Sequence, residues 1–171
     1  SIQQFPSLSI MKSISNTLAT LLIAGSIHAA KSPEEAKVYA DVIQPLLNAK
    51  CVNCHGEGKQ KGGLRLDSAE HVFKGGKGAK EDNIVKGNIE DSELTYRISL
   101  PKDDDDVMPP FESPDTFDPF SKEQQNIVNW WVKEGAKLEV TVAQAPESVR
   151  PEMLKILEKA PESKVAKKAE M

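Results

Sequence analysis

Apolar residues recur at helical spacing in several stretches of the chain, and glycine-rich, proline-rich or charged segments separate these stretches. The first one leads up to residue 51 and carries Tyr39, Val42, Ile43, Leu46 and Leu47. Similar patterns cover residues 92–98, 121–135 and 153–157, and no segment predicts a convincing strand. The pattern therefore favours a small helical protein.

Two of these helices carry recognisable start signals. Residues 32–35 (Ser-Pro-Glu-Glu) combine an N-cap serine, a proline at the first helical position and a glutamate three residues after the cap. Residues 121–124 form a second capping box, and Gly135 ends the helix that follows. Pro45 interrupts the first pattern, so we expect a kink there or a fresh start capped by Asp41.

The segments between the predicted helices are dominated by glycine and proline. Residues 56–78 contain seven glycines and read as loops around a short stretch at 64–66. Residues 103–110 join four aspartates to Met108-Pro109-Pro110 and are not helical across the prolines. Four adjacent acids lack the alternating spacing of a calcium loop, so we interpret residues 103–106 as a solvated acidic loop.

The first thirty residues resemble a leader with a secretory signal peptide. Lys12 supplies a positive charge, residues 14–27 form an uncharged apolar stretch, and His28-Ala29-Ala30 ends in small residues suited to cleavage. We expect translation to start at Met11. The apolar stretch is short for a membrane span, although an uncleaved anchor is the alternative. The remaining protein is then exported, periplasmic or beyond, and has no membrane span once the signal is removed.

Composition narrows the function further. The chain has 171 residues, with 22 basic against 26 acidic side chains, and this acidic balance argues against a nucleic-acid binder. Aromatic residues make up only 5% of the chain, so a core built from side chains alone would be thin.

Cys51-Val52-Asn53-Cys54-His55 has the C-x-x-C-H pattern of covalent haem attachment. Two thiols at this spacing can reach the two vinyl groups of one porphyrin, and the adjacent histidine then faces the iron. A redox-active cysteine pair, a zinc site and a structural disulfide are the alternatives. Only two cysteines are present, and the apparent export signal also favours one covalent haem c.

The second axial position of the iron has four candidates. Met108 lies in an extended segment locked by two prolines, which lowers the entropic cost of holding a weak thioether ligand. Met153 fits core packing better, Met171 is terminal, and His71 reads as a surface histidine. We therefore predict His55 and Met108 as the metal ligands, with Cys51 and Cys54 as the attachment residues.

Packing around the haem can also be assigned from the pattern. Of the adjacent Trp130 and Trp131, we expect one to pack inward against the haem pocket or the first helix, and the other to be partly exposed. The residues expected to exclude water from the haem are Val42, Leu46, Leu47, Leu66, Leu94, Ile98, Ile127 and Trp131.

These residues resemble the class I monohaem cytochrome c family, and most closely the planctomycete-type cytochrome c domain. The likeness spans about residues 38–137 and is carried by five motifs in the family's order, at 41–47, 51–56, 61–67, 108–110 and 131–136. The resemblance implies a small all-α fold around one covalent haem, with crossing N- and C-terminal helices. It also implies His55 and Met108 as axial ligands, and electron transfer as the function.

We accordingly expect a haem domain at residues 31–137, followed by a charged tail at 138–171 with a short amphipathic helix. The leading hypothesis is an electron carrier, not an enzyme, which exchanges electrons with redox proteins of the periplasm. One alternative is a haem-based sensor or enzyme with a displaceable sixth ligand. Another is an interaction module that the haem stabilises and whose tail binds a partner.

Overall fold

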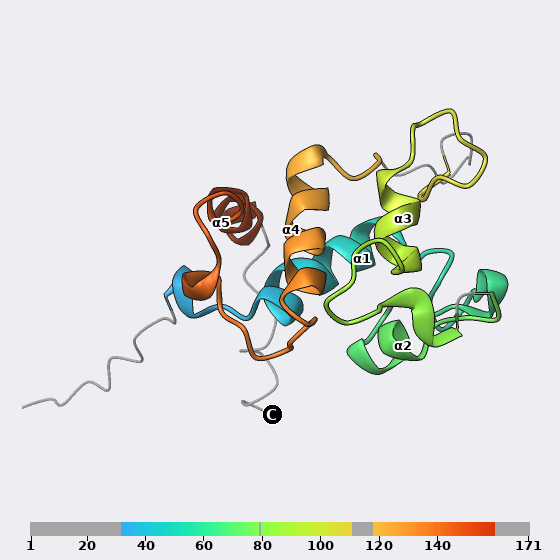
Figure 1. The fold of residues 1–171 in the computed structure, drawn as a ribbon, viewed down its shortest axis with the longest axis horizontal. Coiled ribbons are helices and arrows are strands. Elements are labelled where there is room, and N and C mark those ends of the chain that lie inside the picture. Colours follow the sequence, from blue (N-terminus) through green and yellow to red (C-terminus); the bar gives the residue numbers. More distant parts are fainter. Residues whose placement is uncertain (1–31, 79, 111–117, 160–171) are drawn as a thin grey trace, which may run out of the picture. The chain divides into compact units, whose positions relative to one another are not determined.

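The structure, a computed structural model, describes residues 32–78, 80–110 and 118–159. The chain divides into two units, Ser1–Ala30 and Lys31–Met171, and all described residues belong to the second. The expected signal peptide at 1–30, with its start at Met11, lies outside the described residues, as does Met171. Within the described ranges every regular element is helical, which confirms the all-α fold class (Figure 1).

The elements are short and connected by loops. In chain order they are η1 (Pro33–Glu35), η2 (Val38–Ile43), α1 (Gln44–Lys50), η3 (Lys61–Gly63), α2 (Ala69–Lys74), η4 (Lys80–Asn83), α3 (Glu93–Ser99), α4 (Lys122–Lys133), η5 (Val142–Gln144) and α5 (Arg150–Lys159). Of the η elements described in detail, η2 is a π-helix and η1, η3, η4 and η5 are 3-10 turns.

The helix start expected at Ser32 forms only one turn. The Ser32 N–H donates to Oε2 of Glu35 at 3.1 Å, as a capping box requires, but Ala36 is extended with ψ 142°. The backbone then pairs with a distant segment, because the Val38 N–H donates to Val140 O at 2.9 Å and Ala36 O accepts from Val142 N–H at 3.0 Å. This pairing separates η1 from the helix that follows.

The long N-terminal helix accommodates Pro45 by changing its winding. Residues 38–43 are π-helical, the Gln44 N–H donates to Tyr39 O five residues back, and Pro45 then lies in the first turn of α1. A proline lacks the N–H that an α-helical interior needs, and a π-turn is one way to absorb that loss. Asp41 does not cap α1, because its carboxylate accepts the Lys37 N–H at 2.6 Å instead.

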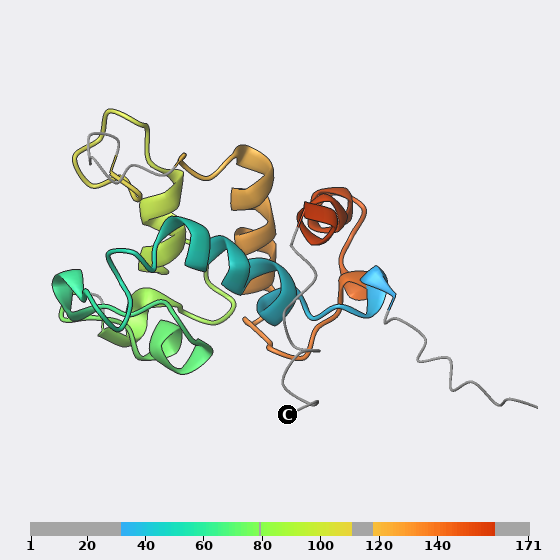
Figure 2. The ribbon, with the colours of Figure 1, turned by 180° about the vertical axis from the view of Figure 1, so that it is seen from behind.

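α4 crosses the N-terminal helix, as the resemblance implied. Figure 1 shows α4 lying across the helix of η2 and α1, and Figure 2 shows the same crossing from behind. At the contact the rings of Trp131 and Tyr39 lie 5.2 Å apart, and Trp131 is fully buried while Trp130 is partly buried. The expected inward and outward tryptophans are therefore confirmed. The capping box at Ser121 is present, and Gly135 follows the helix with φ 88°.

Residues 138–159, which we expected to be the beginning of a tail, pack against the same core. Val142 and Met153 are fully buried, and α5 contacts both η2 and α4. The burial of Met153 confirms its role as core filler. The structured unit thus extends beyond residue 137, at least to Lys159.

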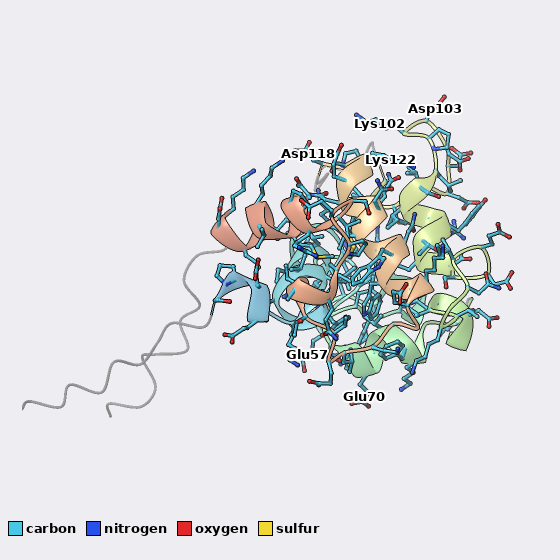
Figure 3. All side chains as sticks on the ribbon, turned by 60° about the vertical axis from the view of Figure 1, so that its left-hand side comes forward. Glu57, Glu70, Lys102, Asp103, Asp118 and Lys122 are labelled. Atoms are coloured by element: carbon cyan, nitrogen blue, oxygen red, sulfur yellow. The ribbon has the colours of Figure 1, made fainter. Side chains whose placement is uncertain are left out.

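Charged side chains cover the outside of the described unit. Figure 3 shows Lys102 and Asp103 at the tip of the loop after α3, and Glu57 and Glu70 at another edge, all pointing outward. Among the described residues, no helix is both long enough and apolar enough to cross a membrane.

Candidate haem site

A cavity of about 310 Å³ lies between the C-x-x-C-H segment, the glycine-rich loops, α3 and the segment that carries Met108. Its volume is at the lower end of the range for small-molecule sites. Four residues with iron-binding or haem-attaching chemistry line it, namely Cys51, Cys54, His55 and Met108. Its apolar wall comes from Leu64, Leu66, Leu94, Ile98 and Pro110, and its other lining residues are Lys61, Gly62, Gly76, Gly78, Asn83, Glu93 and Arg97.

The C-x-x-C-H segment follows directly from α1 and is held by backbone hydrogen bonds. The Cys51 N–H donates to Leu47 O at 2.8 Å, and the His55 N–H donates to Cys51 O at 2.9 Å. The returning loop closes on the same segment, since the Lys61 N–H donates to Cys54 O at 3.0 Å and the Leu66 N–H donates to His55 O at 2.7 Å. Both edges of the motif are therefore fixed by main-chain contacts.

The surroundings of His55 leave one ring nitrogen able to bind iron. Nδ1 lies 3.1 Å from Lys61 O. A carbonyl oxygen only accepts hydrogen bonds, so Nδ1 carries the proton and Nε2 keeps its lone pair. Burial lowers the pKa of His55 below its usual value, which favours the neutral ring. A neutral imidazole oriented through its other nitrogen is the usual form of a histidine ligand to a metal.

The two cysteines are free thiols in different surroundings. Cys51 is buried, and burial raises its pKa to about 12, while Cys54 is partly exposed. Neither is joined in a disulfide. Among the described residues, no group of three His, Cys, Asp or Glu side chains is placed to hold a metal ion.

The glycine-rich loops approach one another closely beside the cavity. A Cβ added at Gly76 would lie 2.9 Å from Leu64 Cβ and 3.0 Å from Gly62 O, so no side chain fits there without movement. A Cβ added at Gly78 would meet nothing within 4 Å. Gly62 itself has φ 65°, a conformation that L residues rarely adopt. The glycines thus let the backbone form this wall of the cavity.

Met108 reaches the cavity on the segment 101–110, which we call the Met108 strap. The Met108 N–H donates to Arg97 O at 3.1 Å, at the end of α3, and the neighbouring Val107 and Pro109 are buried. The Met108–Pro109 peptide bond is cis. The strap therefore brings the Met108 side chain to the cavity that the two cysteines and His55 also line.

The other candidates for the second axial position do not line this cavity. His71 is part of α2, and its Nδ1 lies 3.0 Å from Asp67 Oδ1 and 2.9 Å from Ser68 Oγ at the start of that helix. Met153 lies on α5 and its side chain is fully buried in the core. Met171 is outside the described residues.

All eight residues expected to wall off the haem are buried, but only Leu66, Leu94 and Ile98 line the cavity. The other five belong to the core behind it. Their apolar spacing predicted burial correctly, and it could not tell a residue facing the cavity from one facing the neighbouring helix.

Sequence reasoning missed several residues of the site. Arg97, Glu93, Lys61 and Asn83 all line the cavity. Asn83 is 1% exposed and donates from Nδ2 to Val72 O at 2.7 Å. The spacing of Glu93 and Arg97 by four residues on a predicted helix was the one local signal, because such a pair can meet on a helix surface. Helix α2 was also missed, although Ser68 is an N-cap that accepts the His71 N–H at 3.3 Å.

The geometry fits a covalently attached haem. Two thiols, a neutral imidazole and a thioether line one cavity whose wall is mainly apolar, and these are attachment and axial groups of c-type haems. Residues 51–112, just over a third of the chain, match the family model described as Planctomycete cytochrome C. No curated protein and no solved structure shows significant similarity to the chain. The matched segment contains Cys51, Cys54, His55 and Met108, so the family model over residues 51–112 matches the planctomycete-type cytochrome c domain that the sequence motifs resemble.

Proposed function

We propose that this protein is an exported c-type cytochrome, which transfers single electrons through one haem attached to Cys51 and Cys54 and ligated by His55 and Met108. The observation that carries the proposal is the meeting of these four side chains at one largely apolar cavity. The family match at residues 51–112 supports the same function, because c-type cytochrome domains are typically electron carriers.

Each residue has a defined task in this proposal. Cys51 and Cys54 would hold the porphyrin covalently, each through one thioether bond from its sulfur. His55 offers Nε2 to the iron while Lys61 O holds Nδ1. Met108 offers its thioether sulfur from the opposite segment of the chain. When bound, the haem supplies the one-electron couple between ferric and ferrous iron.

The surroundings favour electron exchange over substrate chemistry. His55 and Met108 would together hold the iron and would leave no position on it for oxygen or peroxide. Leu66, Leu94 and Ile98 are buried, so they keep water from that part of the cavity. Methionine ligation raises the reduction potential, and the acidic residues 103–106 act in the opposite direction if they lie near the haem edge. A periplasmic redox protein is the proposed partner, and the apolar stretch 14–27 after Lys12 supports export.

The proposal is tested by expressing the full chain with a cytochrome c maturation system and measuring the mass of the denatured protein by mass spectrometry. We expect a mass increase of one haem that survives denaturation, and reversible reduction by one electron. The matched control is the double variant Cys51→Ser and Cys54→Ser, which keeps the size of both side chains. A wild-type chain that stays colourless, with two free thiols, contradicts the proposal.

A further inference from the structure

Arg97 joins three parts of the site through different atoms. Its Nε donates to Oε1 of Glu93 at 2.6 Å, one turn earlier on α3. Its Nη1 forms an ion pair with Oδ1 of Asp106 at 2.5 Å and donates to Asp106 O at 3.2 Å. Its backbone oxygen accepts the N–H of Met108 at 3.1 Å. One residue of α3 thus binds the strap both through its side chain and through its main chain.

The Met108 strap depends on Arg97 for its polar attachment. Among the described residues, the other hydrogen bonds of residues 101–110 run within the strap, from Asp104 N–H to Pro101 O, from Val107 N–H to Asp104 O, and from Asp106 N–H to Oδ1 of Asp104. In the described part of the chain, every hydrogen bond from the strap to another segment goes to Arg97. Val107 and Pro109 are buried and add apolar contacts. Such contacts stabilise the position of the strap, but they are less directional than hydrogen bonds.

We propose that Arg97 is the positioning residue for the second axial ligand: its guanidinium fastens the strap to α3 and thereby limits how often Met108 leaves the iron. This inference rests on the proposed function, since it assumes that Met108 ligates the haem. Arg97 acts on the iron through the strap, and Glu93 keeps the guanidinium in place on α3. The planar fork of arginine is suited to this task because it can bind two partners at once.

The expected increase in strap opening on loss of the Arg97 guanidinium follows from how exposed its ion pairs are. The side chains of Arg97, Glu93 and Asp106 are 30%, 37% and 61% exposed, so each ion pair is partly screened by water. Pairs of this kind contribute little singly, whereas linked charge-assisted hydrogen bonds contribute more. We therefore expect loss of the guanidinium to raise the frequency of strap opening about five- to tenfold.

Carbon monoxide reports this opening, because it binds ferrous iron only after Met108 has left. In Arg97→Gln we expect carbon monoxide to bind about five- to tenfold faster than in the wild type. Arg97→Lys keeps the charge but not the fork, and its rate should lie between the two. High salt should accelerate binding in the wild type and much less in Arg97→Gln, because only the wild type has the ion pairs to screen.

The matched control is Arg150→Gln on α5. The Arg150 side chain is 31% exposed, and its contacts to Ala145 O, Ala143 O and Glu147 do not involve the strap. This variant should bind carbon monoxide at the wild-type rate. Asp106→Asn keeps the shape of the strap and removes one charge, and we expect a roughly threefold increase in rate. If Arg97→Gln does not fold, the Asp106→Asn variant tests the role of Arg97 in its place.

Hydrogen exchange provides a readout that does not involve the haem. The Met108 amide is bonded to Arg97 O, so strap opening in Arg97→Gln should speed its exchange, while amides of the C-x-x-C-H segment should exchange as in the wild type. Equal carbon monoxide rates and equal Met108 exchange in the wild type, Arg97→Gln and Asp106→Asn would overturn the role of Arg97. A wild type that lacks the methionine–iron charge-transfer band would instead overturn the proposed ligation, so the two failures are distinguishable.

Discussion

The two segments that bring the proposed iron ligands to the cavity are held in different ways. The C-x-x-C-H segment is bonded through its backbone to α1 on one side and to the returning loop at residues 61–66 on the other. The Met108 strap is bonded, within the described residues, to Arg97 alone. The His55 side is thus held by main-chain contacts close in sequence, while the Met108 side is joined to one residue of α3, through one main-chain hydrogen bond and through the Arg97 side chain.

This difference has a consequence for function. Backbone hydrogen bonds within a turn are insensitive to salt, whereas partly exposed ion pairs weaken as salt rises. We therefore expect His55 to stay bound under conditions in which Met108 begins to dissociate.

Replacing residues on the two sides should give qualitatively different products. The double variant Cys51→Ser and Cys54→Ser should lose covalent haem completely, because no thiol remains for attachment. Met108→Ala should keep the covalent haem and lose the methionine–iron charge-transfer band, and carbon monoxide should then bind without a delay for ligand release. Denaturing electrophoresis and absorption spectra measure both. A Met108→Ala protein with an unchanged band would show that another residue binds the iron.

The crossing of α4 over the N-terminal helix supports both sides of the site. Trp131 is fully buried, its ring lies 5.2 Å from that of Tyr39 and 6.1 Å from that of Phe73, and its Nε1 donates to Lys137 O at 3.0 Å. Trp131→Ala should lower the free energy of unfolding by about 3–5 kcal/mol, because it leaves a large cavity and removes these contacts. Chemical denaturation measures this loss.

The neighbouring Trp130 is the natural control, since it is only partly buried. Trp130→Ala should lower the free energy of unfolding by less than Trp131→Ala does. Equal losses for the two variants would contradict the packing described for α4.

A pair of glycines tests the wall formed by the loops on the His55 side. Gly76→Ala should destabilise the protein by about 1–3 kcal/mol, because the new Cβ would meet Leu64 Cβ at 2.9 Å and Gly62 O at 3.0 Å. Gly78→Ala should have little effect, since its Cβ would meet nothing within 4 Å. Thermal unfolding of the two variants gives the comparison. If Gly78→Ala were the more damaging change, the loops would not pack as described.

The smallest effect concerns pH and lies in the ionic cluster next to α2. The hydrogen bond from Arg65, whose Nη2 lies 2.6 Å from Asp67 Oδ2, lowers the pKa of Asp67 to about 2. The pKa of an unfolded aspartate is about 3.9. Protons therefore bind the unfolded chain first, so the contribution of Asp67 is present above about pH 4 and is lost as the pH falls towards 2.

We expect this contribution to be about 1 kcal/mol at most, as for other partly exposed ion pairs. It should be absent in Asp67→Asn, which cannot ionise. Urea unfolding at pH 5 and at pH 2.5 measures the difference between the two proteins. An identical pH dependence for the wild type and the variant would show that the Arg65 contact does not stabilise the carboxylate.

The same asymmetry explains how much the sequence could predict. Cys51, Cys54 and His55 form a local motif, and local hydrogen bonds build their surroundings, so the spacing alone identified them. Met108 was predicted from the prolines beside it and from the family resemblance. The Met108 strap is bound by Arg97 through Asp106, which lies nine residues after Arg97 in the chain. No repeating sequence pattern predicts a contact at that spacing.

The fold shows the same limit. Helix α4 and its cap follow from the capping box at Ser121, and α3 follows from the apolar spacing of residues 92–98. The break after η1 does not, because it depends on pairing between residues 36–38 and residues 140–142. That pairing joins segments about a hundred residues apart, and the composition of the second segment predicts the start of a tail. The charged composition predicts a tail there and only Met153 was assigned to the core, yet Val142 is fully buried as well.

The central claim is that one cavity holds a covalent haem between His55 and Met108. The most direct test is the absorption spectrum of the matured full chain, recorded oxidised, then reduced, and then reduced under carbon monoxide. We expect a covalently bound, six-coordinate haem with the methionine–iron band when oxidised, and slow binding of carbon monoxide when reduced. A pigment that denaturation removes from the chain, or a reduced form that binds carbon monoxide at once, would contradict it.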